Sequence, residues 1–416
     1  MLLNIFINII FFIEVLLILS LEKKMWKTYF TPTFFLTIPF TIVWFFTLIF
    51  SEKLGFFKLF TPALIIWIIG ILFFWIPSFI ICIIIHKLGF QFSLPSKNIT
   101  NNINFKNDKL ILYFSFFISI LFLFRLSKFI YHLGFNVIGS DFFATLFAGY
   151  GFWGHLRVIL IPLIVYHIFY FKYNTKYKIL ILLIFFWVLL LYQVKGWIIV
   201  ALITSIIIKI FFDNIKINFK LLFISVLIGF FVFFASYYLS IVHNLDNNFN
   251  LNFVFWTIKH FTYYLFSGII GFSEYVKHNY TIDLNYHVIL APLINIWNYC
   301  MGKPYVNIIN PFEINIGNVY KSNVYSFFGT VYIFAGYYKG ILISLYFGFI
   351  YYILYLLFLT MHNIWLLIAI FYLMTLLSLG WFEFYLFHFD VIEIPIFCLF
   401  LSLLFQINQK FKFNVV

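Results

Sequence analysis

Charged side chains are scarce in this sequence. Only 9% of its 416 residues are Asp, Glu, Lys or Arg, whereas 65% are apolar. A soluble globular domain carries roughly 25% charged residues, so these side chains are too few to coat a water-facing surface of this size. The sequence therefore excludes a soluble globular protein and predicts that lipid surrounds most of the chain.

Motifs for cofactors are also lacking. The three cysteines stand apart and predict neither a disulfide framework nor a metal site. We find no Gly-rich phosphate loop, Cys/His cluster or GxSxG elbow, so we expect no cofactor and no metal. We find no internal repeat either, which disfavours transporter folds built from inverted repeats.

Long apolar runs are what the sequence has in abundance. Crossing a bilayer takes roughly 17–25 residues, and eleven segments come close to this length: 2–20, 29–50, 62–85, 110–130, 152–171, 179–194, 197–212, 221–243, 340–360, 364–380 and 391–408. The first has no basic start or small-residue cleavage site, so we expect a retained helix rather than a signal peptide. We expect an all-α polytopic membrane protein with about 11 transmembrane helices.

The lysines predict the orientation of these helices. If the N-terminus faces out, 15 of the 24 lysines lie in loops and flanks that face the cytoplasm, and four lie in short outer loops. Cytoplasmic loops are enriched in Lys and Arg, so we expect an N-out, C-in topology. Such loops explain the net charge of +13 better than a nucleic-acid partner does. We therefore expect no nucleic-acid partner.

One long segment interrupts the pattern and would lie outside the membrane. Residues 243–339 form a large, partly helical outer (periplasmic) loop within a single integral membrane domain of residues 1–416. Its apolar stretch 253–272 fits an interfacial or a re-entrant helix, and 288–301 is similarly apolar. We expect this loop to cap a cavity formed by the helices.

Three cations are candidates for binding a phosphate group. Arg125 and Arg157 are the only arginines, and both stand in apolar segments, where a cation is costly unless it meets water or a partner. Arginine also contacts phosphate through two parallel hydrogen bonds. Lys195 begins a tight Lys-Gly turn between two short helices. For the arginines, the alternatives are snorkelling at a helix end and an ion pair with an acidic residue. For Lys195, the alternative is an ordinary interfacial lysine.

The outer segment contains groups suited to sugar binding and to acid–base chemistry. His260, Tyr263, Tyr264 and Glu274 are crowded together there, and an imidazole or a carboxylate can accept a proton from a hydroxyl group. The alternative is an interfacial aromatic belt with solvated charges. Further along, the G-x-x-x-G from Gly336 to Gly340 is more typical of helix packing than of catalysis.

Two of these stretches resemble a known family. The run Ser322-Asn323-Val324-Tyr325-Ser326-Phe327-Phe328-Gly329, followed by Tyr332, Gly336 and Gly340, resembles the late signature of O-antigen polymerases. The run from Tyr263 to Gly268 with Glu274-Tyr275 resembles their outer-loop segment, and Lys195-Gly196 falls where members often have Arg-Gly. The chain departs from the family at Lys195 and at Phe334-Ala335, where an acidic residue often precedes the glycine.

The resemblance implies a glycosyltransferase that polymerises undecaprenyl-pyrophosphate-linked oligosaccharides outside the bacterial inner membrane. His260 or Glu274 would act as the base. The residues that would bind the diphosphate or sugars are Arg157, Lys195, Arg125, Tyr263, Tyr264, Asn323 and Tyr325. Besides the substrate and membrane lipids, a chain-length regulator and a flippase would be partners. An O-antigen ligase and a lipid-linked oligosaccharide flippase remain alternatives, although the single large outer loop argues against the flippase.

Overall fold

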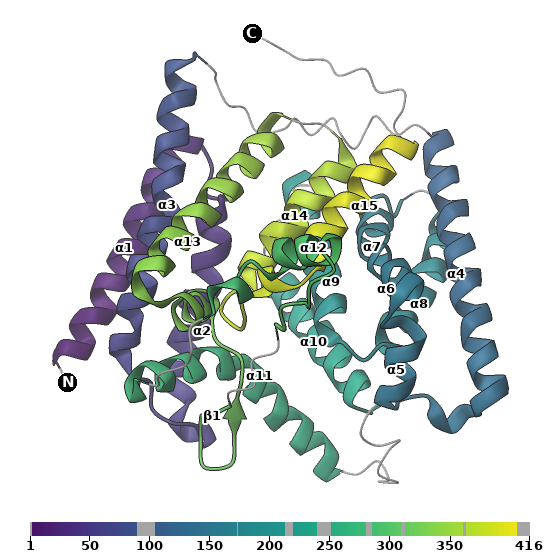
Figure 1. The fold of residues 1–416 in the computed structure, drawn as a ribbon, viewed down its shortest axis with the longest axis horizontal. Coiled ribbons are helices and arrows are strands. Elements are labelled where there is room, and N and C mark those ends of the chain that lie inside the picture. The colour runs from purple at the N-terminus through teal and green to yellow at the C-terminus, as the bar shows by residue number, and fades with distance from the viewer. Residues whose placement is uncertain are drawn as a thin grey trace. The chain divides into compact units, whose positions relative to one another are not determined.

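Helices dominate the computed structural model, which describes residues 2–89, 105–172, 174–212, 219–238, 251–279, 285–308, 313–360 and 363–405 (Figure 1). The α-helices are α1 Leu2–Trp26, α2 Pro32–Phe50, α3 Leu64–Lys87, α4 Phe105–Leu133, α5 Asp141–Ala148, α6 Gly151–Val158, α7 Leu160–Phe169, α8 Thr175–Leu191, α9 Lys195–Phe212, α10 Phe219–Tyr237, α11 Leu251–His278, α12 Ala291–Cys300, α13 Phe327–Thr360, α14 Ile364–Ser378 and α15 Asp390–Phe405. The strands of the described part are β1 Ile314–Asn315 and β2 Lys321–Ser322, which pair antiparallel.

The all-α membrane architecture expected from composition is confirmed. Among the described residues, six helices are long and apolar enough to cross a membrane: Leu2–Trp26, Pro32–Phe50, Thr61–Lys87, Asp108–Leu133, Gly151–Phe169 and Phe327–Thr360. Each of the eleven expected segments is helical over most of its described residues, and shorter apolar helices account for several of them. The count of eleven spans and the N-out orientation stay predictions.

Contacts within the chain group it into two compact units. The first unit comprises Met1–Leu94, Lys259–Thr360 and Leu373–Val391, and the second comprises Pro95–Ile258, Met361–Tyr372 and Ile392–Val416. Most of the expected outer loop, including α12 and both strands, belongs to the first unit. Its first residues, 243–250, lie outside the described part.

The first unit is built around α1, α3 and α13, which lie side by side (Figure 1). A Cβ atom at Gly348 of α13 would lie 2.3 Å from the carbonyl oxygen of Phe74 on α3, so only glycine allows these backbones to approach so closely. The fully buried Glu22 on α1 accepts hydrogen bonds from Thr31 and from Tyr352 on α13. These contacts fix the first helix against one that is formed much later in the chain.

Helix α13 begins earlier than the sequence suggested. We expected a membrane helix at 340–360, but the structure extends it back to Phe327, with a kink at Gly336. Gly336 has φ 69° and ψ −176°, a conformation that is essentially restricted to glycine. The kink separates a short buried first half, which carries Thr330 and Phe334, from the long second half. Gly336, which the sequence analysis assigned to helix packing, therefore also produces a kink in α13.

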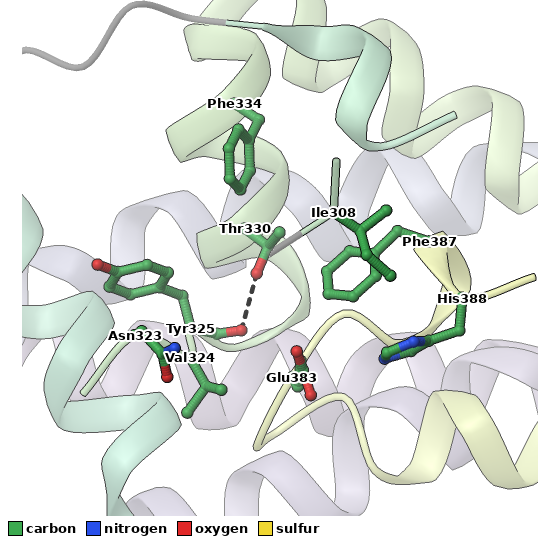
Figure 2. A pocket seen from close by; sticks show the side chains of 9 residues that line it. All are labelled: Ile308, Asn323, Val324, Tyr325, Thr330, Phe334, Glu383, Phe387 and His388. Carbon is green, nitrogen blue, oxygen red and sulfur yellow. Dashed lines mark hydrogen bonds between the residues drawn. The ribbon is translucent and has the colours of Figure 1, made fainter. Parts of the chain in front are cut away.

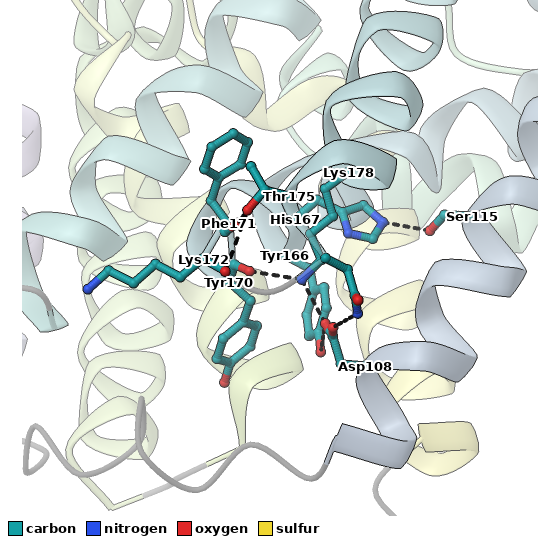
Figure 3. A network of polar contacts seen from close by, with 10 residues as sticks. Asp108, Ser115, Tyr166, His167, Tyr170, Phe171, Lys172, Thr175 and Lys178 are labelled. Atoms are coloured by element: carbon teal, nitrogen blue, oxygen red, sulfur yellow. Dashed lines mark hydrogen bonds and ion pairs between the residues drawn. The ribbon is translucent and has the colours of Figure 1, made fainter.

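In the second unit, a buried ion pair joins α4 to α8 (Figure 3). Lys178 Nζ lies 2.8 Å from Asp108 Oδ1, and the two side chains are 0% and 1% exposed. Lys178 also donates to the Tyr170 carbonyl at 2.8 Å, while Asn174 donates to Asp108 Oδ2 at 3.1 Å. Lys178 therefore takes part in the packing of α4 against α8. In the sequence it directly precedes an apolar run, where a lysine in a solvated loop is expected.

Candidate functional site

A cavity of about 170 Å3 lies in the first unit (Figure 2). Three elements line it: the segment before α13, the first half of α13 and the loop between α14 and α15. The lining residues are Ile308, Asn323, Val324, Tyr325, Thr330, Phe334, Glu383, Phe387 and His388. Polar groups and aromatic rings thus face one space that is large enough for a small ligand.

Backbone contacts with α11 hold the walls of the cavity in place. The amide of Ser326 donates to the carbonyl of Gly268 at 3.1 Å, and the amide of Phe327 donates to the carbonyl of Gly380 at 2.6 Å. A Cβ atom at Gly268 would lie only 2.0 Å from the carbonyl oxygen of Phe382. The two stretches that carry the family resemblance are therefore in direct contact, and both border the loop that leads to Glu383.

Glu383 and His388 are the acid–base groups of this cavity. Figure 2 shows both on the loop between α14 and α15, with Thr330 of α13 across the cavity. Burial raises the pKa of the Glu383 carboxyl to about 7 and lowers the pKa of the His388 imidazole to about 4. Near neutral pH the carboxyl group therefore titrates and the imidazole is uncharged. A carboxyl group with its pKa near the working pH is suited to proton transfer.

None of the described residues forms an ion pair with Glu383. Within the part of the chain that the structure describes, its carboxylate forms no ion pair and no hydrogen bond. Thr330, in contrast, donates its hydroxyl to the Tyr325 carbonyl at 2.8 Å. A half-buried carboxylate without a partner is costly to maintain, and such groups are candidates for a functional role.

The structure places the other predicted residues of the outer segment beside this cavity or within it. Asn323 and Tyr325 line it. Tyr263 donates its hydroxyl to the Lys321 carbonyl at 2.6 Å, and the ring of Tyr264 stacks on that of Phe382, which precedes Glu383. These four predicted residues thus lie in one region.

The two proposed bases on α11 do not meet each other. His260 stacks on Tyr263, with ring centroids 5.3 Å apart. Glu274 is 1% exposed and forms ion pairs with Lys277 at 3.0 Å and with His278 at 3.3 Å, both on its own helix. At 1.5 Å of rise per residue, His260 and Glu274 are about 21 Å apart along α11, so they cannot serve the same reacting atom. Glu274 already has the ammonium of Lys277 as a partner, unlike Glu383.

Arg157 occupies a distinctive environment in the second unit. Its side chain is 7% exposed and its guanidinium lies 4.0 Å from the centre of the Tyr192 ring. Among the described residues, its Nη1 has no hydrogen-bond partner, and neither has the buried Nε2 of Gln193. Two buried donors, one beside the start of α9 and one in the turn that precedes it, thus lack an acceptor among the described residues, and a phosphate group offers acceptors of the kind that such donors bind.

The other two predicted cations differ from Arg157. Arg125 Nε donates to the Phe147 carbonyl at 2.7 Å and its Nη2 donates to the Leu146 carbonyl, so the guanidinium caps the end of α5. The expected Lys-Gly turn is wrong: Lys195 is the first residue of α9, and the turn that precedes it comprises residues 192–194. The side chain of Lys195 lies outside the described part. Its role and that of Arg125 in substrate binding stay predictions.

Sequence reasoning missed Glu383, His388 and Thr330. Glu383 and His388 lie between the apolar runs 364–380 and 391–408, in a short stretch that the predicted topology places on the same outer side as the long segment. A carboxylate and an imidazole between two membrane helices were the available signal. Thr330 was not recognisable because it lies in an apolar run. Across the described residues, no three His, Cys, Asp or Glu side chains gather as a metal site would require.

Comparison with known proteins relates the chain to one relative and to one family. Over 88 residues it is 39% identical to an O-antigen polymerase of Shigella dysenteriae, and this match covers 21% of the chain and 22% of the relative. No solved structure matches the chain. Residues 55–411 match a family of unknown function, DUF6337. Because the match spans most of its length, the chain belongs to the DUF6337 family.

Proposed function

We propose that this protein is a glycosyltransferase that polymerises undecaprenyl-pyrophosphate-linked oligosaccharide repeat units at the outer face of the bacterial inner membrane. The product would be an O-antigen, capsule or exopolysaccharide. The similarity to an O-antigen polymerase supports the class of reaction, and the apolar helices support the location in a membrane.

The environment of Arg157 is the observation that carries the proposal. The leaving group of this reaction is a diphosphate, and its negative charge must be stabilised as the bond to the sugar breaks. Arg157 is a buried cation, and its Nη1 donates to none of the described residues. The buried Nε2 of Gln193 also lacks an acceptor among them. Tyr192 supports the plane of the guanidinium from one side. These groups are suited to a phosphate oxygen.

The reaction that follows is a displacement at the anomeric carbon. A sugar hydroxyl of one lipid-linked unit attacks the anomeric carbon at the reducing end of the growing chain. The carbon–oxygen bond to the diphosphate breaks, and the electron pair leaves with the lipid diphosphate that Arg157 holds. The hydroxyl proton passes to a base. The energy comes from the bond between the anomeric carbon of the donor and its diphosphate, so the reaction consumes no nucleotide.

Deleting the gene tests the proposed reaction. We expect the deletion strain to carry single repeat units in place of long chains, as seen on a gel of surface polysaccharide. Loss of all surface polysaccharide, with long chains still on the carrier lipid, would identify a ligase. Trapping of the units in the inner leaflet would identify a flippase. Either of these two results would refute the polymerase proposal.

Substitution of Arg157 tests the proposed diphosphate contact. We expect Arg157→Ala to abolish chain growth while the protein is still made, and Arg157→Lys to restore only a small part, because lysine keeps the charge without the two-pronged contact. Lys176→Ala, which removes an exposed cation of the same unit, serves as the control and should leave chain length unchanged. Normal polymer from Arg157→Ala would contradict the assignment.

A further inference from the structure

The cavity of the first unit has the features of a sugar-binding site. Its volume of about 170 Å3 is on the scale of one sugar ring. Rings of Phe334 and Phe387 offer apolar faces for the C–H side of a sugar, and Asn323 and His388 carry groups of the kind that hydrogen-bond to hydroxyls (Figure 2).

We infer that this cavity binds the acceptor sugar and that Glu383 is the catalytic base that removes the proton from its attacking hydroxyl. The inference rests on the proposed polymerase function and adds to it the residue that activates the acceptor. Neither of the bases suggested by the sequence, His260 and Glu274, lines the cavity.

The contacts of Glu383 favour this role over a structural one. A structural carboxylate is normally paired, as Glu274 is with Lys277 and His278, whereas Glu383 has no ion pair or hydrogen bond among the described residues. A hydroxyl donor from a bound sugar would supply the missing partner. Burial also raises the pKa of Glu383, which makes its carboxylate a stronger base than an exposed one.

The acceptor oxygen forms a bond to the anomeric carbon of the donor as the bond from that carbon to the diphosphate oxygen breaks. The hydroxyl proton moves to a carboxylate oxygen of Glu383, and the diphosphate leaves with the bonding electron pair. Loss of the proton to water restores the carboxylate for the next cycle.

Purified protein in lipid nanodiscs tests the inference. The substrate is the lipid-linked repeat unit extracted from the deletion strain, and the rate of chain formation is measured. General bases typically contribute about 10²–10⁴-fold, so we expect Glu383→Gln to slow chain formation at least about 100-fold, and Glu383→Asp to retain more activity than Glu383→Gln. Glu52→Gln removes an exposed carboxylate of the same unit and should leave the rate unchanged.

Binding of undecaprenyl diphosphate without sugar separates the two proposals. We expect Glu383→Gln to bind this lipid as the wild type does, which also shows that the variant is folded, and Arg157→Ala to lose binding. A wild-type rate for Glu383→Gln would overturn the role of Glu383 and leave the polymerase proposal intact. If the wild-type protein itself forms no chains from the repeat unit, the proposed function fails instead.

The pH dependence of the rate provides a second readout. Because the carboxyl is active only when deprotonated and its pKa is about 7, the wild-type rate should rise as the pH increases from 6 to 8. The other titratable groups around it are His388 and Tyr385 on the same loop, Tyr264 on α11 and Tyr325 before α13. Glu383→Gln should abolish the rise. A rise that persists in this variant would assign the titration to another group and refute Glu383 as the base.

Discussion

Replacing Asp108 by leucine should destabilise the second unit severely. In the native protein its carboxylate accepts from Lys178 at 2.8 Å, from Asn174 at 3.1 Å and from the hydroxyl of Tyr166 at 3.4 Å (Figure 3). With leucine in its place, the buried ammonium of Lys178 keeps one hydrogen-bond acceptor among the described residues, the Tyr170 carbonyl, and the Tyr166 ring 5.9 Å away. An uncompensated charge would then remain in an environment that excludes water.

The expected magnitude follows from the burial of the pair. Removing one partner of a buried ion pair typically costs about 3–5 kcal/mol, whereas replacing both partners by apolar groups is often neutral. Both side chains are at most 1% exposed, so solvent cannot compensate for the loss. For a domain of about 150–250 residues, each kcal/mol shifts Tm by about 2–4 °C. We therefore expect Asp108→Leu to lower Tm by about 10 °C.

Thermal unfolding in detergent, followed by size-exclusion chromatography of the heated samples, measures this effect. The double variant Asp108→Leu/Lys178→Met should recover most of the lost Tm, because it leaves no unpaired charge. Lys176→Met, an exposed lysine on the same helix, is the control. If the double variant were as unstable as Asp108→Leu alone, or if Asp108→Leu were as stable as the wild type, the stranded charge would not be the cause.

Three further substitutions test the packing of both units. Gly268→Ala should shorten or abolish polymer chains, because its Cβ would lie 2.0 Å from the Phe382 carbonyl oxygen and would displace the loop that carries Glu383; normal chain length would contradict this. Gly336→Ala should lower stability by about 1–3 kcal/mol, seen as a lower Tm, because its φ of 69° and ψ of −176° suit only glycine. Arg125→Met should cost about 1.5–3 kcal/mol through the lost charged hydrogen bonds to the end of α5, and an unchanged Tm would exclude this capping role.

Much of the fold could be predicted because helices in lipid need little more than a long apolar run. The run 62–85, for example, is matched by α3 almost residue for residue. The extension of α13 back to Phe327 was not predictable in this way, because Gly336 and Gly340 mark a turn in one setting and a packing face in another. The positions of polar residues within helices were also misleading, since Lys178 is buried and Asp108 supplies its charge partner from another helix.

The site was predicted only in part, for a different reason. Asn323 and Tyr325 were identified from a local run of residues, and both line the cavity. Glu383 was not identified, because its place in the cavity depends on contacts between distant parts of the chain. The carbonyl of Gly268 and the first turn of α13, which hold the walls of the cavity, are far from it in the sequence. Glu274, in contrast, was singled out from the sequence but does not line the cavity. Its charge stands out in an apolar stretch, but Lys277, three residues later, forms an ion pair with it, and His278 lies 3.3 Å from the same carboxylate.

The hydrogen bonds of Glu22 also constrain the order in which the protein can be completed. Tyr352, one of its donors, lies 330 residues later in the chain. At about 5–20 residues per second, a ribosome needs roughly 15–65 s to make the intervening segment. For that time the carboxylate of the first helix lacks its Tyr352 donor, although Thr31 has already been synthesised. The last contact of α1 is thus available only when α13 arrives, and a nascent chain that stops before Tyr352 would present an incomplete helix pair to the quality-control machinery of the membrane.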